Sequence, residues 1–158
     1  MRLNYAALER IETNMQFYPA LIVCDLSRNR LTSLNPYGFE SQAQLSRLAL
    51  SHNRIHTLYK ESLNGLTNLQ SLDLSHNKLS YLGPKVFGQL HRLSDLDLSA
   101  NNIGSIHRLA FEVSWKYYSV KALLIISRAD DWINFFWSWD ILLDAADSAP
   151  FLPQIKMN

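Results

Sequence analysis

Apolar positions recur along this chain with a period of 24 residues. In residues 69–82 the first, fourth, sixth, eleventh and fourteenth positions are leucine, and the ninth is asparagine. The same arrangement begins at Leu21, Leu45 and Leu93, with cysteine or isoleucine replacing leucine at a few places. No insertion or deletion interrupts the register between residues 21 and 116. A fixed period of this length predicts a solenoid, in which each copy is one unit that stacks on its neighbours.

Each copy contains an alternation of apolar and polar residues that predicts a short strand with one buried face. In the third copy, for example, Leu72 and Leu74 point inward and Asp73 points outward. Because one copy cannot bury its leucines alone, stacked copies are expected to form a parallel sheet with strands about 4.8 Å apart. The other half of each copy contains turn residues such as Asn35-Pro36 and Gly83-Pro84, which argue against long helices there.

Two further rows of residues repeat with the same period. One is a row of large apolar residues in the returning half of each copy: Phe39, Leu63, Phe87 and Phe111. The other is an asparagine after each strand, where the chain turns away from the sheet: Asn29, Asn53, Asn77 and Asn101. An Asn amide both donates and accepts, so this row predicts a buried polar ladder that satisfies backbone groups and has a structural, not a catalytic, role. Asn77 has neighbours on both sides, so its replacement is expected to cost more stability than that of Asn29.

The motif L-x-x-L-x-L-x-x-N-x-L with a 24-residue period resembles the leucine-rich repeat family, over about two-thirds of the chain. With its phenylalanine row, it is similar to the extracellular repeats of Toll-like receptor and adhesion-protein ectodomains. The resemblance implies an α/β-type repeat solenoid: a curved array with a short parallel β-sheet on the concave face and mostly irregular or 3-10 convex segments. It also implies a non-catalytic protein-binding module, as a fragment of a cell-surface receptor or cell-adhesion ectodomain.

The pattern divides the chain into three parts. Residues 1–20 are interpreted as a degenerate N-terminal repeat, with Leu8, Ile11 and Phe17 at its apolar positions. Residues 21–116 hold the four clean repeats. Residues 117–158 form a non-repeat, aromatic-rich tail, either a folded irregular cap or unselected sequence. The apolar stretches of this tail are too short for a membrane span, so no transmembrane segment is predicted.

The net charge and the cysteine content indicate which kinds of partner and which cellular compartment to expect. The net charge of +1 implies no general attraction to nucleic acid or to anionic membranes. Cys24 is the single cysteine and occupies a leucine position, so it is expected to be a small buried apolar residue. Extracellular members of the resembled family usually carry disulfide-bonded caps, and no cysteine cluster flanks this array. The alternatives to a cell-surface fragment are therefore a cytoplasmic scaffold and a truncated product without independent function.

Outward strand positions form columns across the predicted concave face, and these are the candidate site. Inward positions are committed to the core, whereas outward ones vary and carry mixed charge, which favours a protein ligand. The column containing Asp73 and Asp97 places like charges on adjacent strands, balanced by solvent, by Arg47 or by a ligand. The predicted protein-binding residues are Arg28, Arg47, His52, Ser71, Asp73, His76, Asp95 and Asp97.

No catalytic, cofactor-binding or metal-binding residues are predicted. His52 and His76 occupy equivalent positions on adjacent repeats, but a zinc site needs three or four ligands. The sequence contains no phosphate-binding loop and no nucleophile with an activating base and oxyanion hole. The sequence therefore favours a binding module over an enzyme.

Overall fold

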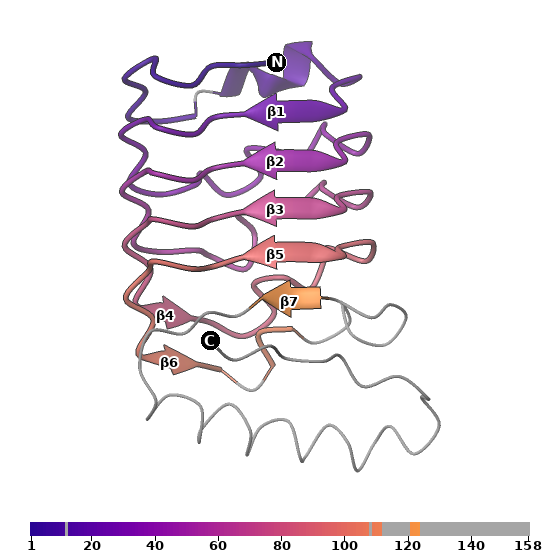
Figure 1. Ribbon diagram of the computed structural model, residues 1–158. Coiled ribbons are helices and arrows are strands. Elements are labelled where there is room, and N and C mark those ends of the chain that lie inside the picture. Colours follow the sequence, from indigo (N-terminus) through magenta and orange to yellow (C-terminus); the bar gives the residue numbers. More distant parts are fainter. Residues whose placement is uncertain (12, 108, 112–120, 124–158) are drawn as a thin grey trace.

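Short parallel strands stack one above another along the array (Figure 1). The structure is a computed structural model that describes residues 1–11, 13–107, 109–111 and 121–123. The elements are the 3-10 helix η1 (Thr13–Phe17) and the strands β1 (Val23–Asp25), β2 (Arg47–Ala49), β3 (Ser71–Asp73), β4 (Tyr81–Leu82), β5 (Asp95–Asp97), β6 (Ser105–Ile106) and β7 (Lys121–Leu123).

The main sheet is parallel throughout, with the strand order β1-β2-β3-β5-β7. Cys24, Leu48, Leu72 and Leu96 are register partners on its first four strands, so each step along the sheet is one 24-residue period. This register confirms the predicted sheet. The last step is longer, because Asp95 pairs with Lys121, 26 residues further along the chain. Most of the predicted tail, 117–120 and 124–158, lies outside the described residues.

The opposite side of the array is built from turns and very short strands. β4 and β6 form a second, two-stranded parallel sheet, and an isolated bridge joins Ser33 to Thr57, the equivalent pair two repeats earlier. Among the described residues η1 is the only helical element. The turn and breaker residues of the sequence thus produce the irregular convex segments that the pattern predicts.

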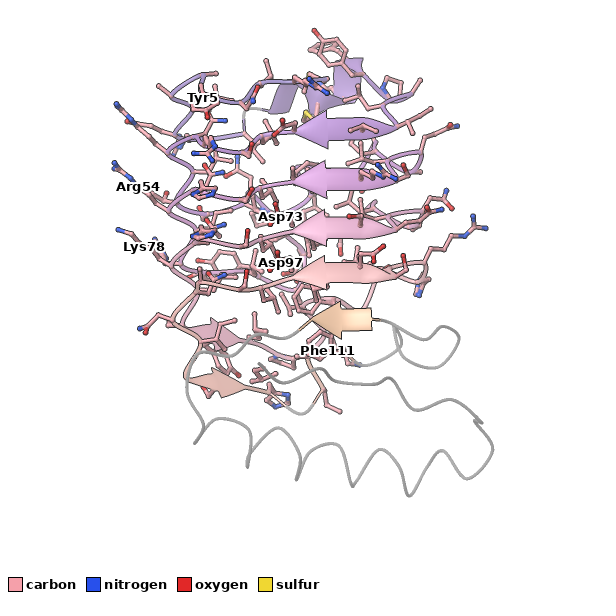
Figure 2. The ribbon with its side chains drawn as sticks, in the orientation of Figure 1. Tyr5, Arg54, Asp73, Lys78, Asp97 and Phe111 are labelled. Carbon is pink, nitrogen blue, oxygen red and sulfur yellow. The ribbon has the colours of Figure 1, made fainter. Side chains whose placement is uncertain are left out.

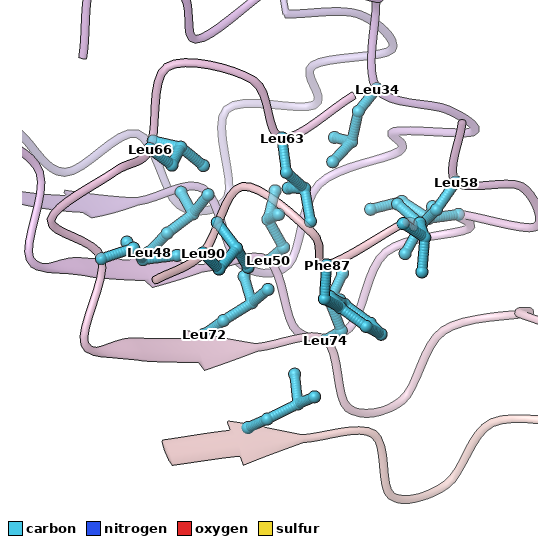
Figure 3. Close-up of a cluster of buried hydrophobic side chains, with 14 of the residues drawn as sticks. Leu34, Leu48, Leu50, Leu58, Leu63, Leu66, Leu72, Leu74, Phe87 and Leu90 are labelled. Carbon is cyan, nitrogen blue, oxygen red and sulfur yellow. The ribbon is translucent and has the colours of Figure 1, made fainter. Parts of the chain in front are cut away.

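Leucine side chains from successive repeats fill the space between the two sides (Figure 3). The row of large apolar residues is buried, and the Phe87 and Phe111 rings stack with centroids 5.0 Å apart. Met15 continues this row one period before Phe39 and is also buried. Phe17, which the sequence placed among the apolar positions of residues 1–20, is 70% exposed. The assignment of Phe17 was wrong because Met15 already fills the position that packs inside.

The asparagine ladder is hydrogen-bonded across repeats. Asn53 accepts a bond from the Leu31 backbone N–H at 3.0 Å and donates through Nδ2 to the carbonyls of Leu26 and Leu50. Asn77 and Asn101 repeat this set one and two periods later. Each amide therefore joins the turn of its own repeat to the repeat before it, which satisfies backbone groups that would otherwise be unpaired.

Residues 1–11 supply the same partners to the first repeat. The Leu8 backbone N–H donates to Asn29 Oδ1 at 3.0 Å, and Asn29 Nδ2 donates to the Leu3 carbonyl at 2.8 Å. Arg2 forms a parallel bridge with Asp25 beside β1. Asn29 is therefore as fully bonded as Asn77, and the expected difference between their replacements has no basis in hydrogen bonding.

Candidate protein-binding face

The outward side chains of β1, β2, β3 and β5, with the turn that follows each strand, make up the concave face. The register places Val23, Arg47, Ser71 and Asp95 in one column and Asp25, Ala49, Asp73 and Asp97 in the next. A third column lies in the turn, where Arg28, His52, His76 and Ala100 follow at the same period. All eight predicted residues therefore lie within these three columns.

The first column carries two accessible charges of opposite sign. Arg47 and Asp95 are exposed and Ser71 is half-buried. The Asp95 carboxylate accepts a hydrogen bond from the neighbouring Ser94 hydroxyl at 2.9 Å. Because these groups are displayed on hydrogen-bonded strands, their spacing is fixed by the sheet rather than by flexible loops.

The acidic column has a structural role. Asp73 Oδ1 accepts bonds from the Ser75 backbone N–H at 2.9 Å and from the Ser75 hydroxyl at 2.7 Å. Asp25 makes the same pair of bonds with Ser27, and Asp97 accepts from the Ser99 N–H. These carboxylates hold the turn after each strand, as Asp side chains commonly do. Within the described ranges Arg47 forms no ion pair with these carboxylates.

The turn column adopts an uncommon backbone conformation. Arg28, His52, His76 and Ala100 all have φ between 52° and 56°, the left-handed region that non-glycine residues seldom enter. The His52 and His76 rings stack with centroids 4.2 Å apart and an interplanar angle of 8°. Upstream, the Arg28 guanidinium lies over the Tyr5 ring at 5.5 Å. A repeated backbone turn thus brings these side chains into one row that contains two stacked pairs.

The stack perturbs one titratable group. Loss of hydration is the largest cause lowering the pKa of His52, followed by the Arg28 guanidinium and His76, while Asp73 opposes the shift. The neighbours therefore favour the neutral imidazole at His52. The pair has no third ligand nearby, because no group of three His, Cys, Asp or Glu suited to a metal exists in the part of the chain that the structure describes.

Cys24 lies in the core, as its leucine position predicts. The thiol is free and buried, and burial is the main cause that raises its pKa to about 11. The thiolate is the reactive form of cysteine, so this residue is a poor nucleophile in the folded chain.

A family model described as "Leucine rich repeat" matches residues 43–103, the stretch that contains β2, β3, β4 and β5. These residues are leucine-rich repeats in both sequence and fold. A solved structure, the leucine-rich repeat domain of APL1B, superposes with a TM-score of 0.61 at 24% sequence identity. That alignment covers 64% of this chain and 30% of that chain, and it shows a shared fold. No curated protein gives a significant match. Among the described residues, no helix is long and apolar enough to cross a membrane.

The sequence interpretation missed one set of charged residues on this leucine-rich repeat array. Each ladder asparagine in the first three repeats is followed at once by a cation: Arg30, Arg54 and Lys78. All three are exposed. The signal that identifies them is the 24-residue period itself, read one position beyond the asparagine. The interpretation covered strand positions and the turn before the asparagine, and so passed over them.

Proposed function

We propose that the chain is a protein-recognition module that binds its partner through the concave face. Leucine-rich repeat arrays typically bind proteins and are generally not enzymes. The supporting observation is the column of Arg47, Ser71 and Asp95, which lies in fixed register on the sheet. Arg47 forms no ion pair with any described residue, so its guanidinium is available to an acidic group on a partner.

Asp73 and Asp97 are among the predicted binding residues, but both hold turns, so a charge reversal there would change stability as well as binding. A cleaner variant combines Arg47→Glu with Asp95→Lys and leaves the net charge unchanged. We expect it to weaken partner binding by about tenfold, in a salt-dependent way, because charges at an interface set orientation and association rate. Its urea midpoint should equal that of the wild type.

The matched control moves the same charges to the opposite side. Glu40→Lys with Lys60→Glu also preserves the net charge, and both positions are exposed in the turns of the convex half. The partner is captured from the native source, and its dissociation constant is then measured against the three proteins. A loss of binding in the control with none in the Arg47/Asp95 variant would place the interface on the convex side.

We further propose that this module is part of a cell-surface receptor or adhesion ectodomain, on the strength of its 24-residue repeats and phenylalanine row. A cytoplasmic scaffold is the second candidate, and it is favoured by the single, buried cysteine, since extracellular domains of modest size are usually rich in disulfides. Antibody staining of intact against permeabilised cells separates the two. Staining that needs permeabilisation would favour the scaffold.

A further inference from the structure

Three cations form a row along the edge of the array where the strands end. This basic edge consists of Arg30, Arg54 and Lys78. Their order is fixed by backbone bonds, because the Arg54 N–H donates to the Leu31 carbonyl and the Lys78 N–H donates to the Ile55 carbonyl. Figure 2 shows Arg54 and Lys78 projecting from this edge, one repeat apart and away from the sheet. Equivalent backbone positions lie about 5 Å apart in such a stack.

The cations of the basic edge form no ion pair with an acidic residue within the described ranges. The segments that carry them, 26–32, 50–56 and 74–80, contain no Asp or Glu. Like charges stacked in adjacent repeats repel each other, and these side chains project to solvent and add nothing to the core. The repulsion within the row therefore lowers the stability of the isolated array, and a bound anionic ligand would relieve it.

The surroundings of the basic edge distinguish between kinds of anion. On the side of the turn column, Arg28 adds another cation, and the His52 and His76 rings lie in the next two repeats. Beyond them, the concave face carries the acidic column of Asp25, Asp73 and Asp97. Opposite charges thus occupy adjoining parts of one surface. A uniform polyanion is repelled by the acidic column, whereas a protein surface can present both signs.

We propose that the basic edge binds an acidic, extended segment of a protein partner. The inference deepens the proposed function, because it assigns the partner a carboxylate-bearing stretch that lies beside the concave face. Alternate side chains of an extended segment are about 7 Å apart on one face, and long Arg and Lys side chains span the difference from the repeat spacing. Guanidinium groups bind carboxylates in a bidentate manner, which favours arginine at two of the three positions.

The test uses the full chain and a short fluorescent peptide of alternating Glu and Thr, with anisotropy as the readout at neutral pH. The variant is Arg54→Glu with Lys78→Glu. The matched control is Arg92→Glu with Lys60→Glu, which changes the same residue types and the same net charge at exposed positions off the basic edge. We expect the wild type and the control to bind the peptide equally, and the variant to bind about tenfold or more weakly.

Equal binding by the variant and the wild type would overturn the inference. A heparin oligosaccharide is measured in parallel, and tighter binding of heparin than of the peptide at this edge would assign the site to a sulfated polysaccharide instead. These outcomes are separable from failure of the proposed function. Arg47→Glu with Asp95→Lys reports on the concave face through the captured partner, whereas the peptide reports on the basic edge alone.

Discussion

Gln42 is a buried polar residue whose side-chain amide is only partly hydrogen-bonded. Gln42 stands in a row that is leucine in the next two repeats, at Leu66 and Leu90. Its Nε2 donates to the Met15 carbonyl at 2.6 Å, but its buried Oε1 has no partner. The Met15 carbonyl also accepts a bond from the Tyr18 N–H, so it would keep a partner if Gln42 were replaced.

Gln42→Leu should therefore raise the free energy of unfolding by about 1 kcal/mol, because the gain from removing an unsatisfied buried oxygen exceeds the loss of one hydrogen bond. The urea midpoint measures the change. The matched control is Leu66→Gln in the equivalent position, which introduces a buried amide and should lower the midpoint. A lower midpoint for Gln42→Leu would mean that its bond to η1 outweighs the unpaired oxygen.

The pKa of His52 gives the array a predictable pH dependence. The folded state lowers this pKa, so the unfolded chain takes up the proton first as the pH falls through about 6.5. The contribution of His52 to stability is therefore constant at higher pH, falls through that window, and levels off below the folded pKa. His52→Asn, which tolerates the left-handed backbone, should flatten this part of the profile. Unchanged urea midpoints across pH 5.5–7.5 in both proteins would contradict the assignment.

At the scale of the element, the ladder and the turns determine how repeats attach to one another. Asn77→Leu would leave the Ile55 N–H without its acceptor and would remove one of the two amide bonds to the Leu50 carbonyl. We expect a loss of about 1–3 kcal/mol, the usual cost of unsatisfied buried groups. Asn29→Leu should cost a similar amount, because residues 3 and 8 supply the equivalent partners. Chemical denaturation of both variants checks the pair, and a negligible loss at Asn29 would show that residues 1–11 detach readily.

Gly65 is the turn position with the least tolerance for a side chain. Its φ is +91°, and an added Cβ would lie 2.3 Å from the Phe39 carbonyl oxygen and 2.5 Å from the Glu40 Cα. Gly65→Ala should destabilise the fold by about 2 kcal/mol or more, since backbone cannot move aside easily. Gly104→Ala is the control, because its Cβ would approach nothing closer than 4.0 Å. Equal thermal midpoints for the two variants would contradict this account.

At the scale of the whole molecule, periodicity determines which parts of the structure the sequence reveals. Burial of Leu48, Leu72 and Leu96 follows from the period, because each repeat must hide the same positions. The equivalence of His52 and His76 likewise predicts that they are neighbours, but not that a left-handed turn stacks their rings. Periodicity does not show which outward polar groups bond to backbone, and for that reason the turn-holding role of Asp73 was not predicted. The 26-residue step to β7 departs from the 24-residue period, so the period does not predict the position of that strand.

The asparagine ladder also determines how long a loop each repeat closes when it docks on the repeat before it. Asn53 and Asn77 each take partners from 22 and 27 residues earlier in the chain, and every further step repeats those separations. The entropy lost on closing a loop depends on its length, so each repeat that docks closes a loop of the same size. Lengthening the array adds closures without making any of them longer, and folding can extend from any docked pair by equal steps.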